Sequence, residues 1–263
     1  MTQTPYYKAH WVHIEEERLA RYERFFQWQE GNAWQLEGLD PAPGMVLADY
    51  GCGPGHLSLE LARRVGPDGH VHALDVNADF VASTRAKAEA AGLADRISVH
   101  HLTGEPVPLP DASIDGVMCK TVLVYVDDPA GTLAEFRRIL KPGGRAQLID
   151  SDWDLFTVDA VPPDVWRRFM QAAGHAFSTP QIGRRLYALA REAGFAEVVP
   201  RIVARPDLDG RLMNVVQNMA GYVCEGGTLP EVEIAAVLAQ AETAREEGRF
   251  FAVNPQFMVT ATA

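Results

Sequence analysis

One aspartate and three glycines stand close together after a short apolar run, in Val46-Leu47-Ala48-Asp49-Tyr50-Gly51-Cys52-Gly53-Pro54-Gly55. The run predicts a buried strand, and apolar residues from Leu57 onward predict a helix directly after the turn. Glycines permit a tight turn and let the backbone approach a ligand. Because ligands of open α/β sheets bind beyond the carboxyl ends of strands, this turn is a candidate nucleotide site.

The glycine spacing separates two kinds of nucleotide site. Dinucleotide-binding enzymes use G-x-G-x-x-G, with a pyrophosphate at the N-terminus of the helix. This chain has G-x-G-x-G, with Asp49 two residues before the first glycine. A carboxylate at that place suits a cofactor that carries an ammonium group and would repel a pyrophosphate.

A second carboxylate, Asp75, ends the apolar segment 70–76, which predicts the next strand. A carboxylate at the end of the second strand can accept hydrogen bonds from both hydroxyls of a ribose. Alternatively, Asp75 only caps the helix that follows. Asn77 can cap that helix itself, so the ribose role is favoured.

The elements that position these residues alternate regularly between strands and helices. Such alternation predicts a doubly wound α/β fold with a mostly parallel, seven-stranded sheet and right-handed crossovers. Strands are expected at 45–50, 70–76, 96–102, 114–120, 145–150, 197–204 and 249–263. Helices are expected at 10–30, 57–65, 77–91, 128–140, 163–175, 182–193, 208–224 and 230–247.

Helical segments at both ends of the chain predict a cap over this core. Residues 10–30 place Trp11, Tyr22 and Phe26 at helical spacing, and 206–248 is too long for a simple connection between two strands. The expected organisation is an N-terminal helical cap (1–40), a cofactor-binding core (41–205), a helical lid (206–248) and a final strand of the core sheet (249–263).

Charge and cysteine content exclude several classes of function. With 35 acidic and 24 basic residues, the net charge is −11, which opposes binding to nucleic acid. The cysteines, Cys52, Cys119 and Cys224, lie far apart without metal-ligand spacing, so no metal is expected. No run of about 18 apolar residues indicates a membrane span. A cytoplasmic monomer or homodimer acting on a small molecule is expected.

Several motifs make the chain similar to a known family. DYGCGPG, ALDVN, PLPDASIDGV, VLVYVDDP and RRILKPGGR resemble the class I S-adenosylmethionine-dependent methyltransferases, in the small-molecule branch similar to ubiquinone/menaquinone C-methyltransferases. The resemblance implies S-adenosylmethionine as the cofactor. It also implies that Asp75 holds the ribose and that Val76 packs on the adenine. The methionine part would be held by Asp49 and the turn residues Gly51, Cys52, Gly53, Gly55 and His56.

The same resemblance assigns the remaining cofactor contacts. The family commonly has Asp-Ala against the adenine where this chain reads Thr103-Gly104-Glu105, so the Thr103 hydroxyl or a main-chain amide would substitute. Cys119 and Lys120 fall where the family lines the sulfonium region, although a buried packing role is favoured for Cys119. Asn77 and, on the N-terminal helix, Tyr22 complete the expected contacts.

The cofactor carries its own activated methyl group, so the protein must align the acceptor with it and exclude water. Tyr125, at a place where relatives often carry His, is a candidate base, or a packing residue. Asp152 beside Trp153 could attract a cationic amine acceptor, or belong to a solvated loop. His175 is a third candidate base, and His10 and His13 are further ones. For each of these histidines the alternative is a packing or surface role.

Three functions follow from these residues. The favoured one is methyl transfer to an O, N or C atom of a small molecule. A nicotinamide-dependent oxidoreductase is the second, and the G-x-G-x-G spacing with Asp49 weighs against it. The third is a protein that binds S-adenosylmethionine without catalysis, which an acceptor pocket blocked by side chains would support.

Overall fold

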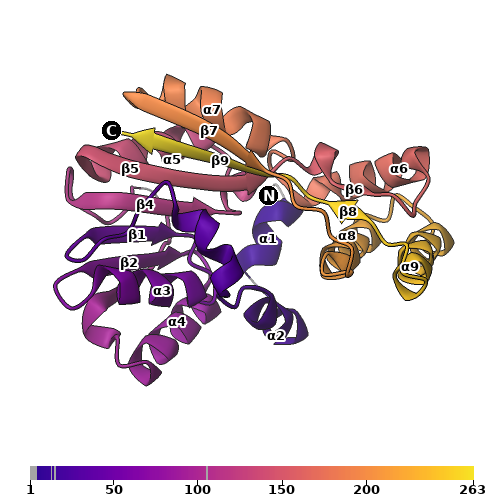
Figure 1. Ribbon diagram of the computed structural model, residues 1–263, viewed down its shortest axis with the longest axis horizontal. Helices are drawn as coiled ribbons and strands as arrows, with labels where there is room; N and C mark the ends of the chain where they lie inside the picture. The colour runs from indigo at the N-terminus through magenta and orange to yellow at the C-terminus, as the bar shows by residue number, and fades with distance from the viewer. Residues whose placement is uncertain (1–4, 13, 15, 105) are drawn as a thin grey trace.

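The computed structural model describes residues 5–12, 14, 16–104 and 106–263. Its centre is a seven-stranded sheet in which β9 alone runs antiparallel to its neighbours (Figure 1), so the expected doubly wound, mostly parallel sheet is confirmed. The strand order is β3 (Ile97–His101), β2 (His70–Asp75), β1 (Val46–Tyr50), β4 (Ile114–Lys120), β5 (Leu140–Ser151), β9 (Gln256–Thr262) and β7 (Glu197–Val203).

Helices cover both faces of this sheet. Leu47 points to the face covered by α3 (His56–Val65) and α4 (Ala78–Ala90), whereas Ala48 points to the face covered by α5 (Pro129–Ile139) and α7 (Ile182–Glu192). Alternate strand residues point to opposite faces, so each central strand is buried on both sides.

Two expected caps are confirmed, because Asn77 accepts a hydrogen bond from Phe80 N of α4 and Asp128 accepts one from Gly131 N of α5.

The N-terminal segment is divided, contrary to the single helix expected at 10–30. It forms α1 (Tyr6–Val12), α2 (Glu16–Phe25) and the 3-10 helix η1 (Glu30–Leu36). At the end of α1, Asn77 Nδ2 donates to the Trp11 carbonyl at 2.9 Å. Trp11 of α1 stacks on Tyr22 of α2, with ring centroids 5.2 Å apart.

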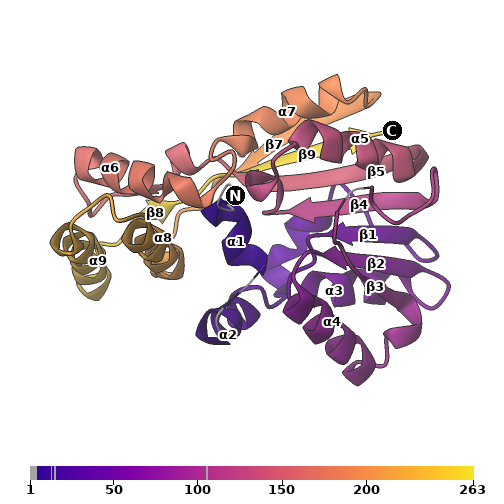
Figure 2. The same cartoon turned by 180° about the vertical axis from the view of Figure 1, so that it is seen from behind.

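A second group of helices projects beyond one end of the sheet (Figures 1 and 2). It comprises α6 (Pro163–Ala173), α8 (Met213–Gly226) and α9 (Glu231–Glu246), which pack on one another. We call this group, with the small sheet described next, the cap. Its helix α6 lies inside the range expected for the core, but it contacts α8 and α9 of the expected lid.

The closing strand and the fifth strand differ in extent from expectation. The segment expected as one strand at 249–263 is divided into β8 (Ala252–Val253) and β9, and β8 pairs with β6 (Thr157–Val158). Pro255 lies at the division and has no N–H for a sheet. Strand β5 begins at Leu140 instead of 145, through a shift in register opposite Ile114.

Short 3-10 turns complete the described chain: η2 (Ala94–Arg96), η3 (Leu123–Tyr125), η4 (Trp153–Leu155) and η5 (Gly174–Ala176). None of the helices in the described part of the chain has the length and apolar character needed to cross a membrane.

Candidate cofactor and acceptor site

A large cavity opens at the carboxyl ends of the parallel strands, with a volume of about 1510 Å³. One wall is the turn after β1 with the ends of β2 and β4. The N-terminal helices form a second wall, and α8 with the start of β9 forms a third. Drug-sized ligands usually occupy about 300–1,000 Å³, so this volume has room for a cofactor and a second molecule together.

The turn after β1 is built so that its backbone faces the cavity. Gly51 N and Cys52 N both donate to the Leu74 carbonyl of β2, at 2.7 and 3.0 Å. Gly51 and Gly53 have positive φ angles of 74° and 53°. A Cβ on Gly51 would lie 2.3 Å from the Val122 side chain, whereas one on Gly53 would meet no atom within 4 Å and would project into open space. A ligand can therefore approach the backbone at Gly53.

Asp75 lies beside this turn and is 6% exposed. Its Oδ2 accepts a hydrogen bond from Gly53 N at 2.7 Å, and its Oδ1 accepts one from Asn77 N at 2.9 Å. Burial raises the pKa of Asp75, and these backbone donors oppose that rise. The two oxygens offer about four acceptor sites in total, so the carboxylate has capacity for a further donor in the cavity. The neighbouring Val76, 48% exposed, offers an apolar surface there.

Asp49 lies deeper, at the floor of the same cavity. It is 2% exposed, and its Oδ2 accepts a hydrogen bond from Ser58 Oγ at 2.6 Å. Burial raises the pKa of Asp49 to about 6, against the opposing effect of Ser58. A cationic ligand group would favour the ionised form, so the position suits an ammonium group.

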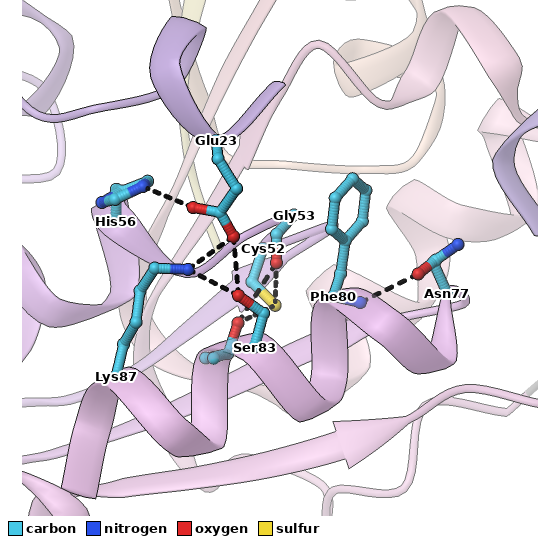
Figure 3. Close-up of polar contacts among 9 residues, drawn as sticks. Glu23, Cys52, Gly53, His56, Asn77, Phe80, Ser83 and Lys87 are labelled. Carbon is cyan, nitrogen blue, oxygen red and sulfur yellow. Dashed lines mark hydrogen bonds and ion pairs between the residues drawn. The ribbon is translucent and has the colours of Figure 1, made fainter. Parts of the chain in front are cut away.

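Glu23 of α2 fastens the N-terminal helices to the core (Figure 3). Its carboxylate contacts Lys87 Nζ at 2.6 Å, Ser83 Oγ at 2.7 Å and His56 Nε2 at 3.1 Å. Burial opposes ionisation of Glu23, but these contacts outweigh it and lower the pKa of the carboxyl. We call Glu23 with Lys87, Ser83 and His56 the α2 latch. It holds Tyr22 against the cavity.

The structure brings most of the predicted cofactor residues to this cavity and leaves some outside it. The residues in its wall are Tyr22, Asp49, Gly51, Cys52, Gly53, Asp75, Val76, Thr103, Gly104 and Lys120. Those outside the wall are Gly55, His56, Asn77 and Cys119. His56 belongs to the α2 latch, Asn77 caps α4, and Cys119 is buried in the core. Glu105 lies outside the described residues.

Tyr125 is in the cavity wall, with its ring edge-on to Trp11 at 4.8 Å. Burial, with the neighbouring Tyr222, Tyr22 and Asp150, raises the pKa of the Tyr125 hydroxyl well above its usual value. A group that is so hard to ionise is poorly suited as a general base. Its hydroxyl is suited to hydrogen bonding with a ligand.

Asp152 and His175 do not reach the cavity wall. The Asp152 side chain is fully buried and ion-paired with Arg184, whose Nη2 donates to Oδ1 at 2.8 Å. Its charge is therefore already balanced and does not face an acceptor. The His175 ring packs at a tilt against Tyr6, with ring centroids 5.1 Å apart, and contacts the Ala172 carbonyl. His13 and the side chain of His10 lie outside what the structure describes.

Several polar residues of the cavity wall were not predicted from the sequence. Asn214 and Asn218 of α8 lie in this wall with Asn254, Gln256 and Ser151. Gln256 Nε2 donates to Ser151 Oγ at 2.8 Å, and Asn254 Oδ1 is buried with no partner in the described structure. The sequence feature that could have revealed Asn214 and Asn218 is their four-residue spacing, which places both amides on one face of a helix. We call these five residues the amide wall.

Among the described residues, no group of three or more His, Cys, Asp or Glu side chains could hold a metal ion. The groups that the site does present to a ligand are a glycine-lined turn, two buried carboxylates, the amide wall and aromatic rings.

Comparison with known proteins agrees with this geometry. Residues 46–144 match a family described as a methyltransferase domain. An uncharacterised transposon protein of Streptomyces fradiae is 39% identical over 171 residues, which are 64% of this chain and 48% of that protein. Nocamycin O-methyltransferase of Saccharothrix syringae is 32% identical over 169 residues, 64% of this chain and 54% of that enzyme. Demethylmenaquinone methyltransferases also match.

Solved structures share the fold. A SAM-dependent methyltransferase from Aquifex aeolicus aligns with a TM-score of 0.54 at 20% identity, over 73% of this chain and 93% of that one. Residues 46–144 thus match a methyltransferase domain, and the fold around them is the one that these solved methyltransferases share. The chain spans about half the length of the curated relatives it matches, with 48% and 54% of the first two covered.

Proposed function

We propose that this protein transfers the methyl group of S-adenosylmethionine to a small molecule held between the core and the cap. The observation that carries this function is the continuity of the cavity. The wall that holds Asp49 and Asp75 continues without interruption into the amide wall and the apolar side of α8. An arrangement with cofactor groups at one end and a separate polar surface at the other suits a reaction between two bound molecules.

In this proposal the cofactor lies along the turn after β1. Asp75 accepts hydrogen bonds from the ribose hydroxyls, Val76 packs on the adenine, and Asp49 attracts the ammonium group. Gly53 leaves the space that the ligand needs, since a side chain there would project into the cavity. Thr103 and Gly104 stand at the adenine edge in place of the Asp-Ala of relatives.

The cofactor supplies an activated methyl group, so this chain needs only to orient the acceptor and exclude water. Tyr125 and Trp153 present rings on one side of the acceptor space, and the amide wall presents hydrogen-bonding groups on another. The α2 latch keeps Trp11 and Tyr22 over the cofactor, where they shield the reacting atoms from solvent. Methyl transfer to oxygen is favoured, as in the nocamycin enzyme named above.

Titration calorimetry tests the cofactor half of this function. We expect S-adenosylhomocysteine to bind with one site per chain and NADH not to bind. Binding of NADH in place of S-adenosylhomocysteine would identify a nicotinamide enzyme instead.

Incubation of the protein with methyl-labelled S-adenosylmethionine and fractionated small metabolites tests the catalytic half. Label is expected in a small-molecule fraction. Binding of the cofactor without any transfer would identify a non-catalytic binding protein, although the open acceptor space argues against that outcome.

A further inference from the structure

The carboxylates in the cavity wall are engaged by donors of the protein itself. Asp127 accepts hydrogen bonds from Tyr7 and pairs with Lys8, and Asp207 accepts them from Asp209 N and Leu212 N. Glu135 pairs with Arg138, Asp209 pairs with Arg211, and Asp128 caps α5. Asp49 and Asp75 are held by Ser58 and by backbone donors at the cofactor end. The acceptor space therefore offers no unengaged carboxylate among the described residues to hold an ammonium group.

Lys120 brings the opposite charge into the same cavity wall. It ends β4, next to the turn after β1, and its side chain lies in the cavity wall. Its Nζ lies 5.3 Å from the centre of the Phe26 ring, and none of the carboxylates that the structure describes comes within 4.0 Å of it. The charged groups that face it from neighbouring strands are Asp49 of β1 and Asp150 of β5, which act at longer range.

A cation in this position selects against a cationic acceptor. A protonated amine would meet the Lys120 ammonium and the sulfonium of the cofactor, whereas the two carboxylates that face Lys120, Asp49 and Asp150, are buried and already accept hydrogen bonds from the protein. An ionised oxygen would be attracted by both positive charges. Burial lowers the pKa of Lys120, against the opposing effect of Asp150 and Asp49. An oxyanion beside Lys120 would favour its charged form, because charges interact more strongly away from water.

We propose that Lys120 Nζ holds the ionised oxygen of an acceptor that is an oxygen acid, a phenol or an enol. This inference rests on the proposed function and names its substrate class. The acceptor loses its proton to solvent, and the resulting oxyanion pairs with Lys120. That oxygen then bonds to the methyl carbon while the carbon–sulfur bond breaks and sulfur keeps the electron pair. An anion and a sulfonium become two neutral groups, so charge balances.

The chain offers matched variants for a test. Lys120→Met removes the charge but keeps an unbranched apolar side chain, and Lys120→Arg keeps the charge. Lys141→Met removes a lysine at the other end of the sheet, where it pairs with Asp115. Circular dichroism would verify that each variant folds.

The probe is 4-nitrophenol, whose phenolate is coloured, added to protein saturated with S-adenosylhomocysteine. We expect the wild type, Lys120→Arg and Lys141→Met to raise the phenolate fraction at a pH near the phenol's own pKa. Lys120→Met should bind the phenolate at least about tenfold more weakly, as for losing a charge-assisted hydrogen bond. Benzylamine should not compete with the phenolate.

Three results would overturn the inference: equal phenolate binding by Lys120→Met, stronger binding of benzylamine than of the phenol, or a loss of S-adenosylhomocysteine affinity in Lys120→Met with phenolate binding intact. The last would place Lys120 on the cofactor's carboxylate. Failure of the wild type to bind S-adenosylhomocysteine would instead remove the proposed function, and phenolate binding to the protein alone would still report on Lys120.

Discussion

Asp75 shows how one side chain can serve the fold and the ligand together. Its two oxygens tie the turn at Gly53 to the start of α4 at Asn77, so the carboxylate is fixed before a ligand arrives. Fixed acceptors bind a diol without further loss of side-chain entropy. Asn77 itself caps α4 by accepting the hydrogen bond from Phe80 N, while Asp75 accepts one from Asn77 N.

Replacing Asp75 with Ala should weaken binding of S-adenosylhomocysteine. Loss of hydrogen bonds to a charged acceptor costs about 1.5–3 kcal/mol, which is about a 10- to 150-fold loss of affinity. Titration calorimetry measures it, and Asp68→Ala, an exposed acid in the turn before β2, is the control. Wild-type affinity in Asp75→Ala would remove this residue from the site.

Asp150 is a second buried carboxylate, at the end of β5. It accepts hydrogen bonds from Val124 N at 3.2 Å and Ser151 N at 2.9 Å. Burial nevertheless raises its pKa to about 7, against these donors and the charge of Lys120. Between its ordinary pKa of 3.8 and this value, the folded protein holds a proton that the unfolded chain has released.

The free energy of unfolding should therefore fall as the pH rises from 4 to 7, by up to about 1.4 kcal/mol per pH unit for this group. Asp150→Asn should make that fall shallower, as urea titrations at several pH values would show. Asp159→Asn, an exposed acid, should leave the slope unchanged. An unchanged slope in Asp150→Asn would mean that this carboxyl is ionised in the folded protein.

Among the elements, α2 depends most on a few contacts. Among the described residues, the α2 latch is the polar attachment of α2 to α3 and α4 (Figure 3). It stands beside a small apolar cluster of Tyr22 with Ile14 and Phe80. An element held by few contacts opens locally more often than the sheet does. Its opening would uncover the cofactor end of the cavity, so the latch is suited to control exchange of the cofactor.

Glu23→Gln should speed hydrogen exchange in α2 (Glu16–Phe25) and leave exchange in β1 and β4 unchanged. Loss of the charge weakens the contacts with Lys87 and His56, and dissociation of S-adenosylhomocysteine should become a few-fold faster. Glu60→Gln is the matched control, since Glu60 pairs with Arg64 on α3 away from α2. Exchange in α2 that is equally slow in both variants would contradict a role for the latch.

The sequence predicted the elements of the core better than those around the cavity. Alternating apolar strands and capped helices are local signals, and the caps at Asn77 and Asp128 fall where the pattern placed them. The N-terminal segment, divided into α1 and α2, has a hydrogen bond from Asn77 to the Trp11 carbonyl at the end of α1, a contact between distant residues that no local pattern encodes. The pairing of β6 with β8 is likewise a contact between distant segments of two residues each.

The candidate site shows the same limit. The glycine turn, Asp49 and Asp75 lie within one sequence motif or its neighbour, and the structure brings them to one cavity. Asp152 looked suited to an amine because Arg184, 32 residues away, is not visible as its partner in the sequence. The proposal that Lys120 binds the methyl acceptor depends on the partners of the surrounding carboxylates, which only the structure shows.

In the whole molecule, three distant parts of the chain meet around the cavity (Figures 1 and 2). Described residues of α1, α2 and η1 line one side, the core supplies the carboxylates, and α8 with the end of β5 and the start of β9 supplies the amide wall. Helix α6 packs on α8 and α9, and the cap reaches the cavity through α8 and the segment before it. Variation in this part of the chain would change the acceptor in the proposed function while the cofactor end is kept.

A crystal structure of the protein with S-adenosylhomocysteine tests the central claim most directly. We predict the ribose hydroxyls within hydrogen-bonding distance of Asp75, the adenine on Val76, and the sulfur facing the space between Lys120, Tyr125 and the amide wall. A ligand bound elsewhere, or one whose sulfur faces away from that space, would contradict the account.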